Sequence, residues 1–342
     1  MVMPGTDRTG LAGPLRRALA EAGWLSPSAQ VNMPGADGDG GGGAEPVVGV
    51  DLGGTKLHAV LYDPVRHRLL DRVEPTDPRG GTDVTSQIAQ LVAALTSAAG
   101  LPAGPPPRVA VGCPGAPDPV SGAVLHAPNI PGWDRMDVPG DLEARLGARP
   151  LVHNDANLAA WGEHAWQPGG GSDLAFVAVG TGVGLGLVLG GRLYAGSRGL
   201  AGEVAHLPIG ADPFDPVNLV HGPLEQQVSG AGIERRYLEL AGRRRPAPEV
   251  FAAADDGDGA AAQVLDDLGR LLALALRAVR AIVDPATFVL GGGIGSRPEM
   301  LAATRRWLTV TEGESLQVRT STFGNRAALA GALAAAVSTH RA

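Results

Sequence analysis

The chain has 342 residues, a length that favours two domains, and its hydrophobic fraction of 44% is sufficient for packed cores. The formal net charge is −7 and the lysine and arginine residues do not gather in one block, which argues against nucleic acid as the main partner. The single cysteine, Cys113, excludes an intramolecular disulfide and a multi-cysteine zinc site.

The sequence also indicates where the protein resides. No charged segment followed by an apolar one stands at the N-terminus, so no secretory signal is expected. The most apolar helical run, residues 271–283, contains Arg277 and Arg280 and is too short to span a bilayer. We therefore expect a cytoplasmic protein that does not bind membranes.

Residues 1–45 are predicted to form an N-terminal extension. They contain a short helical pattern at 11–24 and a Gly/Asp tract at 35–43 with the composition of a flexible linker. The remaining chain is divided into a small α/β domain at 46–153, completed by a C-terminal helix at 325–340, and a larger α/β domain at 154–324.

The first motif is a strand–turn–strand pattern. An apolar run at 47–50 ends at Asp51, and a Gly-Gly-Thr turn at 53–55 precedes an alternating run at 56–62, which together predict a β-hairpin. Exposed N–H groups beside a hydroxyl and a carboxylate suit a phosphate and its Mg²⁺. The spacing fits neither a Walker A loop nor a dinucleotide fingerprint, and an ordinary tight hairpin is the alternative.

The elements that follow alternate between helix and strand. Asp155 stands where a strand meets a helix, so its residue type allows two interpretations: a helix N-cap or a catalytic carboxylate. The predicted elements up to this helix are a helix at 83–99, a strand at 108–112, a small hairpin at 120–124, a helix at 141–146, a strand at 151–153 and a helix from 154 to about 166.

A second strand–glycine turn–strand pattern occupies residues 174–189, with its turn at Gly180–Gly184. Two hairpins of one type predict two related halves. A Pro-rich stretch up to Gly222 is expected to be irregular. The later predictions are helices at 232–241, 248–254, 260–283, 298–307 and 327–337, strands at 287–290 and 316–319, and a glycine run at 291–295.

Taken in order, these motifs resemble the ROK family of bacterial sugar kinases and sugar-responsive repressors, within the sugar-kinase and actin superfamily. The resemblance runs from about Val47 to the C-terminus. It implies an α/β, two-domain actin-like ATPase (ribonuclease H-like) fold with an interdomain active-site cleft, usually as a homodimer or homotetramer. The motifs that carry it are Asp51–Lys56, Pro114–Gly115, Ala127–Trp133, Asn154–Asn157, Gly180–Gly184, Gly202–Glu203, His206, Glu225 and Gly291–Gly295.

The resemblance implies ATP and Mg²⁺ as ligands. Two turns would bind the ATP phosphates and Mg²⁺, and the glycine run would lie against the adenosine; taken alone, that run reads as a strand-to-helix turn. The implied residues are Asp51, Gly53, Gly54, Thr55 and Lys56 in the first turn, Gly180, Thr181 and Gly182 in the second, and Gly291, Gly292 and Gly293 in the run.

The same resemblance assigns roles at the sugar. Asp155 would be the general base that takes the proton of the attacking hydroxyl. The residues expected to hydrogen-bond sugar hydroxyls are Asn129, Asn154, Glu203, His206 and Glu225. The alternatives are a surface pair for Glu203 and His206 and a solvated helix residue for Glu225.

One departure from the family concerns a structural zinc. Typical members bind zinc through the histidine at the position of His206 and three later cysteines. An ungapped alignment places those cysteines at Pro216, Asn218 and Pro223, and places the family's sugar-contacting glutamate at Glu225. We therefore expect no zinc, with the loop stiffened by prolines.

The resemblance favours an ATP- and Mg²⁺-dependent sugar kinase, with glucose phosphorylated at its 6-hydroxyl. Other hexoses, an N-acetylhexosamine or a cyclitol stay open as substrates, as does polyphosphate as donor. The rival is a sugar-sensing regulator or binding protein. Against the rival, no DNA-binding domain is expected before Val47, and the Asp51–Lys56 motif and Asp155 are intact.

Overall fold

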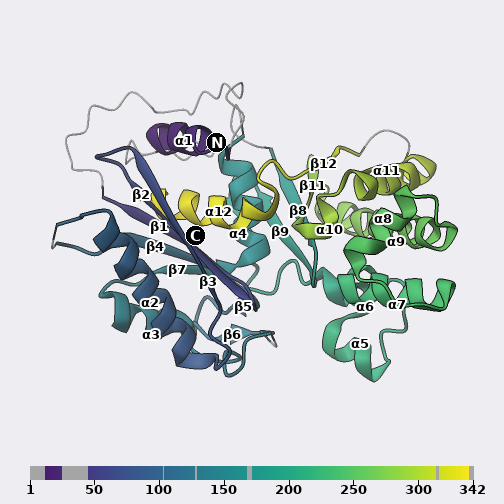
Figure 1. The fold of residues 1–342 in the computed structure, drawn as a ribbon, viewed down its shortest axis with the longest axis horizontal. Helices are drawn as coiled ribbons and strands as arrows, with labels where there is room; N and C mark the ends of the chain where they lie inside the picture. Colours follow the sequence, from purple (N-terminus) through teal and green to yellow (C-terminus); the bar gives the residue numbers. More distant parts are fainter. Residues whose placement is uncertain are drawn as a thin grey trace. The chain divides into compact units, whose positions relative to one another are not determined.

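The computed structural model describes residues 12–24, 45–102, 104–127, 129–167, 172–312 and 316–338. These residues form two compact α/β units, each assembled from separate stretches of the chain (Figure 1). The first unit contains the described residues up to 167, with 190–201 and 326–338; the second contains 172–189 and the described residues of 202–325. Mixed α/β units agree with the predicted class.

The first unit is built on a five-stranded sheet in the order β3-β2-β1-β4-β7. β1 is antiparallel to β2 and β2 to β3, whereas β4 is parallel to both β1 and β7. The first predicted hairpin is confirmed, with Leu52 opposite Leu57. The strands are β1 (Val47–Leu52), β2 (Lys56–Asp63), β3 (Arg68–Pro75), β4 (Arg108–Cys113) and β7 (Leu151–Asn154).

Strand β3 was not predicted. Most of its residues are half-buried or exposed, so the strand lacks the apolar alternation that identifies a half-buried strand. It pairs along its whole length with β2, from Lys56 opposite Pro75 to Asp63 opposite Arg68. Pairing partners, and not its own pattern, therefore make this segment a strand.

Helices cover both faces of the first sheet. Alternate side chains of β1 point to opposite faces, so Val48 and Val50 share a core with α2 (Gly81–Ala98) and α3 (Val138–Leu146). On the other face, Gly49 lies against Leu333 of α12 (Ala327–Val337).

Helix α4 (Asp155–Ala165) belongs to the first unit because it packs on α12. The indole Nε1 of Trp166 donates to Ala330 O at 3.0 Å, next to this contact. The boundary predicted between residues 153 and 154 therefore lies inside the first unit. The C-terminal helix α12 lies in the first unit, where the sequence placed it.

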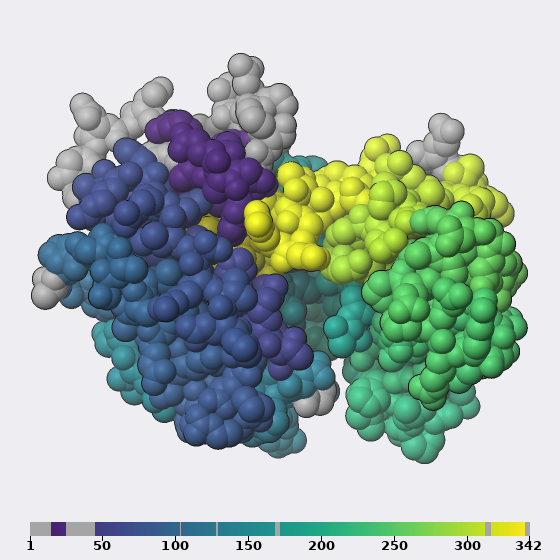
Figure 2. All heavy atoms as spheres, viewed as in Figure 1, coloured from purple at the N-terminus to yellow at the C-terminus, as the bar shows by residue number. Residues whose placement is uncertain are grey.

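The N-terminal helical pattern is confirmed as α1 (Ala12–Glu21), which contacts β3. Figure 2 shows α1 in purple on the surface of the first unit. Leu15 and Leu19 are fully buried, and Arg16 Nη1 donates to Trp166 O at 2.8 Å. The predicted linker at 35–43 lies outside the described residues. Two short strands of this unit, β5 (Ala116–Pro117) and β6 (Val124–Leu125), pair with each other, whereas β10 (Arg192–Leu193) is the edge strand of the sheet in the order β10-β9-β8-β11-β12.

The second unit repeats the hairpin arrangement. β9 is antiparallel to β8, and β11 is parallel to both β8 and β12. The second predicted hairpin is confirmed, with Val179 opposite Val183. The strands are β8 (Leu174–Val179), β9 (Val183–Leu189), β11 (Thr287–Gly291) and β12 (Val318–Thr320).

The helices of the second unit surround a large apolar core in which Leu268, Leu272 and Leu276 of α9 are fully buried. Its helical elements are η1 (Val204–His206), α5 (Pro216–His221), α6 (Pro223–Val228), α7 (Gly230–Ala241), α8 (Ala247–Asp255), α9 (Gly259–Val283), α10 (Gly292–Gly295) and α11 (Pro298–Glu312); η2 (Gly324–Arg326) precedes α12. Throughout the described ranges, no helix combines the length and the apolar character needed to cross a membrane.

Helix α5 corrects the expectation of an irregular stretch. Asp215 caps it by accepting the N–H of Val217 at 3.0 Å, and Pro216 occupies its first turn, where a proline is tolerated. Its apolar residues Val217, Leu219 and Val220 are exposed, so the segment carries no apolar stripe that predicts a helix.

Candidate functional site

The turn between β1 and β2 presents free N–H groups to its surroundings. Gly53 N donates to Lys56 O at 2.8 Å, while Gly53 O and Thr55 O accept hydrogen bonds from Thr76 at 2.7 and 3.1 Å. Gly54 and Thr55 are exposed, and their N–H groups have no acceptor in the part of the chain that the structure describes. Carbonyls held inward and N–H groups left outward give the turn a backbone geometry suited to an anion.

Two carboxylates stand beside this turn. Asp51 of β1 is opposite Gly112 of β4, and a Cβ on Gly112 would lie 3.7 Å from the Cα of Asp155. Burial and the charge of Asp155 together raise the pKa of Asp51 to about 7, against the opposing charge of Lys56. A divalent cation would relieve this repulsion, and carboxylate oxygens are ligands that Mg²⁺ accepts, so these residues fit the implied Mg²⁺.

The start of α4 separates the two interpretations of Asp155. Asn154 is the N-cap: its Oδ1 accepts the N–H groups of Ala156 and Asn157 at 2.9 and 3.3 Å. Asp155, one residue later, accepts the N–H of Ala156 at 2.7 Å within the first turn. Because Asn154 provides the cap, a capping requirement does not explain the carboxylate of Asp155.

Asn154 was predicted to bind sugar, and its side chain is largely engaged within the protein. Besides capping α4 through Oδ1, its Nδ2 donates to Gly115 O at 3.0 Å. A side-chain amide has two N–H hydrogens, so one remains for a ligand. Asn154 therefore fixes the geometry next to Asp155 whether or not it also touches a substrate.

The predicted sugar loop lies against the first turn. A Cβ on Gly54 would lie 3.4 Å from the backbone O of Asn129, which is itself exposed. Trp133, at the end of this loop, is fully buried and acts as a core anchor.

Burial and the charge of Asp155 raise the pKa of the Cys113 thiol, which therefore stays neutral beside the carboxylates.

The second turn, between β8 and β9, is held by a carboxylate. Gly180 N donates to Gly182 O at 2.9 Å, and Val183 N donates to Glu225 Oε2 at 2.9 Å. Gly230 N donates to Gly180 O at 2.9 Å, which fixes the turn to the start of α7. Glu225, predicted to bind sugar, thus also supports the second candidate phosphate turn.

The glycine run forms the junction between β11 and α10, which is the strand-to-helix turn that its sequence predicts when taken alone. Gly292 has a φ of 77°, and a Cβ there would lie 2.4 Å from Val179 O, so only glycine fits. A Cβ on Gly180 would lie 3.7 Å from Gly293 N. The run therefore lies directly beside the second turn.

Polar residues of η1, α5 and α6 gather around Glu225. Burial raises the pKa of Glu225; the N–H of Val183 and the charges of His221 and His206 lower it, and Glu203 raises it. Glu203 is the residue before η1 and is half-buried, whereas His206 is exposed. His221 was missed by the sequence analysis, although it stands only four residues before Glu225.

The loop that lacks the family's cysteines is closed by hydrogen bonds. Asn218 is 6% exposed, and its Nδ2 donates to Asp212 O at 2.7 Å. Pro216 and Pro223 begin α5 and α6. Within the described ranges, no three His, Cys, Asp or Glu side chains are arranged to hold a metal ion. The expected absence of zinc stays a prediction.

The predicted site residues thus form one set in each unit. Sequence reasoning missed three residues that support these sets: Thr76, His221 and Gly230. The first unit holds Asp51, Gly53, Gly54, Thr55, Lys56, Asn129, Asn154 and Asp155, and the second holds Gly180, Thr181, Gly182, Glu203, His206, Glu225, Gly291, Gly292 and Gly293.

Comparisons with known proteins point to one family. A model of the ROK family matches residues 47–339. The bifunctional enzyme NanE/NanK of Brucella melitensis is 36% identical over 277 residues, which cover 78% of this chain and 48% of the enzyme, so the chain spans about half the length of that relative. The N-acetyl-D-glucosamine kinase of Escherichia coli O157:H7 is 32% identical over 269 residues, covering 73% of this chain and 84% of the kinase.

Solved structures give the same result. The ROK hexokinase from Thermus thermophilus aligns with a TM-score of 0.70 and 32% identity, covering 84% of this chain and 97% of the hexokinase. A ROK family glucokinase from Streptomyces griseus, in complex with glucose and AMPPNP, aligns with a TM-score of 0.68 and 28% identity, covering 84% of this chain and 98% of the glucokinase. This likeness confirms the predicted two-domain actin-like ATPase fold.

Proposed function

The chain belongs to the ROK family, and we propose that it is an ATP- and Mg²⁺-dependent sugar kinase, with glucose phosphorylated at its 6-hydroxyl as the first reaction to test. One observation carries the proposal: a turn with free, exposed N–H groups stands beside two carboxylates, Asp51 and Asp155. Phosphoryl transfer requires these parts, namely donors for phosphate oxygens, a metal ligand and a carboxylate at the nucleophile.

Asp155 is the residue we assign to proton transfer. As the sugar hydroxyl attacks the γ-phosphate, the carboxylate of Asp155 accepts the hydroxyl proton. Its position in the first turn of α4, fixed by the Asn154 cap, orients the carboxylate through backbone that is itself hydrogen-bonded. Positioned general bases contribute about 10² to 10⁴ in rate.

Each unit carries its own candidate phosphate-binding turn. The N–H groups of Gly54 and Thr55 donate to phosphate oxygens, and Lys56, which is exposed next to them, adds positive charge. Mg²⁺, when bound near Asp51, neutralises charge on the phosphates. In the second unit, the 180–182 turn and the adjoining glycine run are the candidate nucleotide contacts.

The sugar is recognised by polar side chains that match a polyol. The exposed Asn129 and the group of Glu203, His206 and Glu225 offer paired donors and acceptors. The substrate stays a matter for experiment, because the relatives include both an N-acetyl-D-glucosamine kinase and a glucokinase. Other hexoses, cyclitols and polyphosphate as donor belong in the same test.

The proposal is tested by ADP release with Mg²⁺-ATP against glucose, mannose, fructose, N-acetylglucosamine, N-acetylmannosamine and a cyclitol. Turnover with one or a few of these supports the kinase and names the substrate. No turnover, together with a sugar that still raises the melting temperature, contradicts the kinase and supports the sugar-sensing rival. Repeating the assay with polyphosphate separates the two donors, and light scattering measures whether the chain forms the predicted homodimer or homotetramer.

A further inference from the structure

We propose that Thr76 is a positioning residue that sets the conformation of the first turn, and that the segment 76–81 links this turn to the loop 129–133. Thr76 lies in the loop that follows β3, outside every motif identified from the sequence. Its effect on turnover rests on the proposed function, whereas its effect on the turn does not.

Thr76 controls the carbonyl groups of the turn. Its hydroxyl Oγ1 donates to Gly53 O at 2.7 Å, and its backbone N–H donates to Thr55 O at 3.1 Å. The residue is only 8% exposed, although the turn residues it supports are exposed. A carbonyl oxygen that faced a phosphate would repel it, so drawing two carbonyls inward leaves the N–H groups to face the anion.

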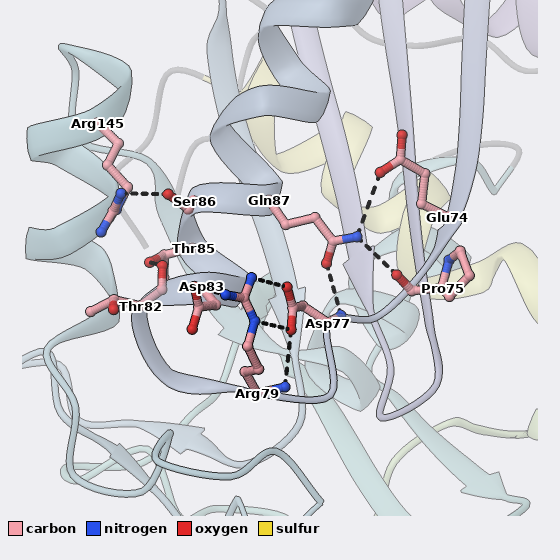
Figure 3. Close-up of polar contacts among 10 residues, drawn as sticks. All are labelled: Glu74, Pro75, Asp77, Arg79, Thr82, Asp83, Thr85, Ser86, Gln87 and Arg145. Atoms are coloured by element: carbon pink, nitrogen blue, oxygen red, sulfur yellow. Dashed lines mark hydrogen bonds and ion pairs between the residues drawn. The ribbon is translucent and has the colours of Figure 1, made fainter.

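Gln87 of α2 holds Thr76 from both sides. Its Nε2 donates to Pro75 O at 2.8 Å, and its Oε1 accepts the N–H of Asp77 at 3.0 Å. The side-chain amide of Gln87 therefore hydrogen-bonds to the residues before and after Thr76, as Figure 3 shows. A buried threonine whose flanking residues are both fixed has little freedom to move its hydroxyl away from Gly53.

The segment continues through a second anchored stretch. Arg79 forms two side-chain hydrogen bonds to the carboxylate of Asp77, at 3.0 and 2.7 Å, and its guanidinium lies 3.1 Å from Asp83 of α2 (Figure 3). These contacts close residues 77–79 into a compact turn. They leave Thr76 at one end of the stretch and Gly80 at the other.

The far end of the segment contacts the candidate sugar loop. Gly81 N donates to Pro131 O at 2.7 Å. Gly80 has a φ of 71°, and a Cβ there would lie 1.9 Å from Pro131 O, so only glycine permits this approach. Residues 76–81 thus contact the phosphate turn at one end and the sugar loop at the other.

The geometry predicts unequal effects of Thr76 on the two ligands. Loosening Thr76 releases the carbonyls of the turn and weakens nucleotide binding directly. The loop that carries Asn129 is affected less, because Gly81 and Pro131 keep their own hydrogen bond. A residue that only stabilised the fold would lower the melting temperature without changing the two Michaelis constants unequally.

The test compares Thr76→Val, which removes the hydroxyl at nearly constant volume, with Thr76→Ser, which retains it. Thr96→Val is the matched control, because the Thr96 hydroxyl bonds only Val92 O of its own helix. Hydrogen exchange is measured in peptides that contain Gly53 and residue 76, whose N–H groups bond within the turn. KM for Mg²⁺-ATP, KM for the sugar and kcat are measured on the same proteins.

We expect about tenfold faster exchange at these amides and about a tenfold higher KM for Mg²⁺-ATP in Thr76→Val, with near wild-type values in the serine and control variants. Unchanged exchange in Thr76→Val would overturn the proposal, as would faster exchange with unchanged KM for Mg²⁺-ATP. If that variant does not fold, Gln87→Leu provides the same readouts. If the wild type phosphorylates no sugar, the proposed function fails while the exchange data still decide the role of Thr76 in the turn.

Discussion

The two glycine turns share a backbone plan and differ in what supports them. Both join the antiparallel strands of a hairpin, and in each the first glycine N–H bonds a carbonyl across the turn, Gly53 to Lys56 at 2.8 Å and Gly180 to Gly182 at 2.9 Å. The first turn is supported by the neutral hydroxyl of Thr76, and the second by the carboxylate of Glu225. A neutral group thus donates to a carbonyl of the first turn, and a charged group accepts an N–H of the second.

This difference separates structural from chemical roles. Beside the first turn, burial and then the charge of Asp155 raise the pKa of Asp51. Burial also raises the pKa of Glu225, and the N–H of Val183 and the charges of His221 and His206 offset only part of that shift. The carboxylate of Glu225 is thus engaged in a hydrogen bond that supports the second turn, whereas Thr76, a neutral residue, supports the first.

The largest effect is expected at Asp155. The first unit alone is assigned the proton transfer, so Asp155→Asn should lower kcat by about 10² to 10⁴ while the KM for sugar changes little. Asn154 still caps α4 in this variant, so the melting temperature should stay close to that of the wild type. Retained turnover in a folded Asp155→Asn protein would contradict the assignment.

The pH dependence of stability tests the acidic pair. The ordinary pKa of an aspartate side chain is 3.8, and that of Asp51 is about 7 in the folded protein, so only the folded form binds this proton between those values. Wild-type stability from this group is therefore lost as the pH rises through that window. The free energy of unfolding of Asp51→Asn should match that of the wild type near pH 4 and exceed it by about 2–4 kcal/mol above pH 7. The variant should lose its activity.

Urea unfolding of both proteins from about pH 4 to 8 measures this difference. The comparison is needed because burial lowers the pKa of His153 to about 4. The contribution of His153 to the stability of the protein is lost in the opposite direction, as the pH falls from 6.5 towards 4. Both proteins contain His153, so the difference between their free energies of unfolding does not include its contribution. A difference that does not change with pH would show that Asp51 is ionised throughout.

A smaller effect is expected at the second turn. Glu225→Ala leaves the N–H of Val183 without its acceptor and should cost about 1–3 kcal/mol, whereas Glu225→Gln keeps an acceptor oxygen and should cost less than about 1 kcal/mol. Glu239→Ala, at an exposed position of α7, is the control. Equal stability of the alanine and glutamine variants would contradict the role of Glu225 in supporting this turn. The KM for sugar in the glutamine variant tests whether Glu225 also recognises the sugar.

The smallest effect is expected from metal removal near the second turn. The loop before Glu225 is held by the Asp215 cap and the Asn218 hydrogen bond, so dialysis against a chelator should shift the melting temperature by less than about 1 °C. Elemental analysis provides the direct measurement. About one tightly bound zinc per chain would contradict the prediction.

Elements with a strong local pattern were predictable, and those defined by their neighbours were not. Both hairpins and helices such as α2 and α9 carry their own apolar periodicity and were identified with small shifts at their ends. Strand β3 and helix α5 carry no such period. Every residue of β3 is half-buried or exposed, and the apolar residues of α5 are exposed. Pairing with β2 forms the first, and a cap with a proline forms the second.

The candidate site shows the same division. Asp51, Asp155 and the glycine turns could be identified because their residue types and order resemble a family pattern. Thr76 and Gln87 could not, because neither stands in a motif and their roles arise only when β3 brings residue 76 beside the turn. Glu225 was predicted as a sugar contact, which stays a prediction, and its hydrogen bond with Val183, 42 residues away in sequence, was not foreseen.

By itself, the sequence determined the two hairpins, the glycine positions, the order of the motifs and thereby the family, since each depends on residues close together in the chain. Only the tertiary structure decided which groups support those turns, that Asn154 and not Asp155 caps α4, and that the pKa of Asp51 is raised. Hydrogen bonds between distant residues and the electrostatic effect of burial depend on distances through space. A linear pattern contains no such distances until the chain has folded.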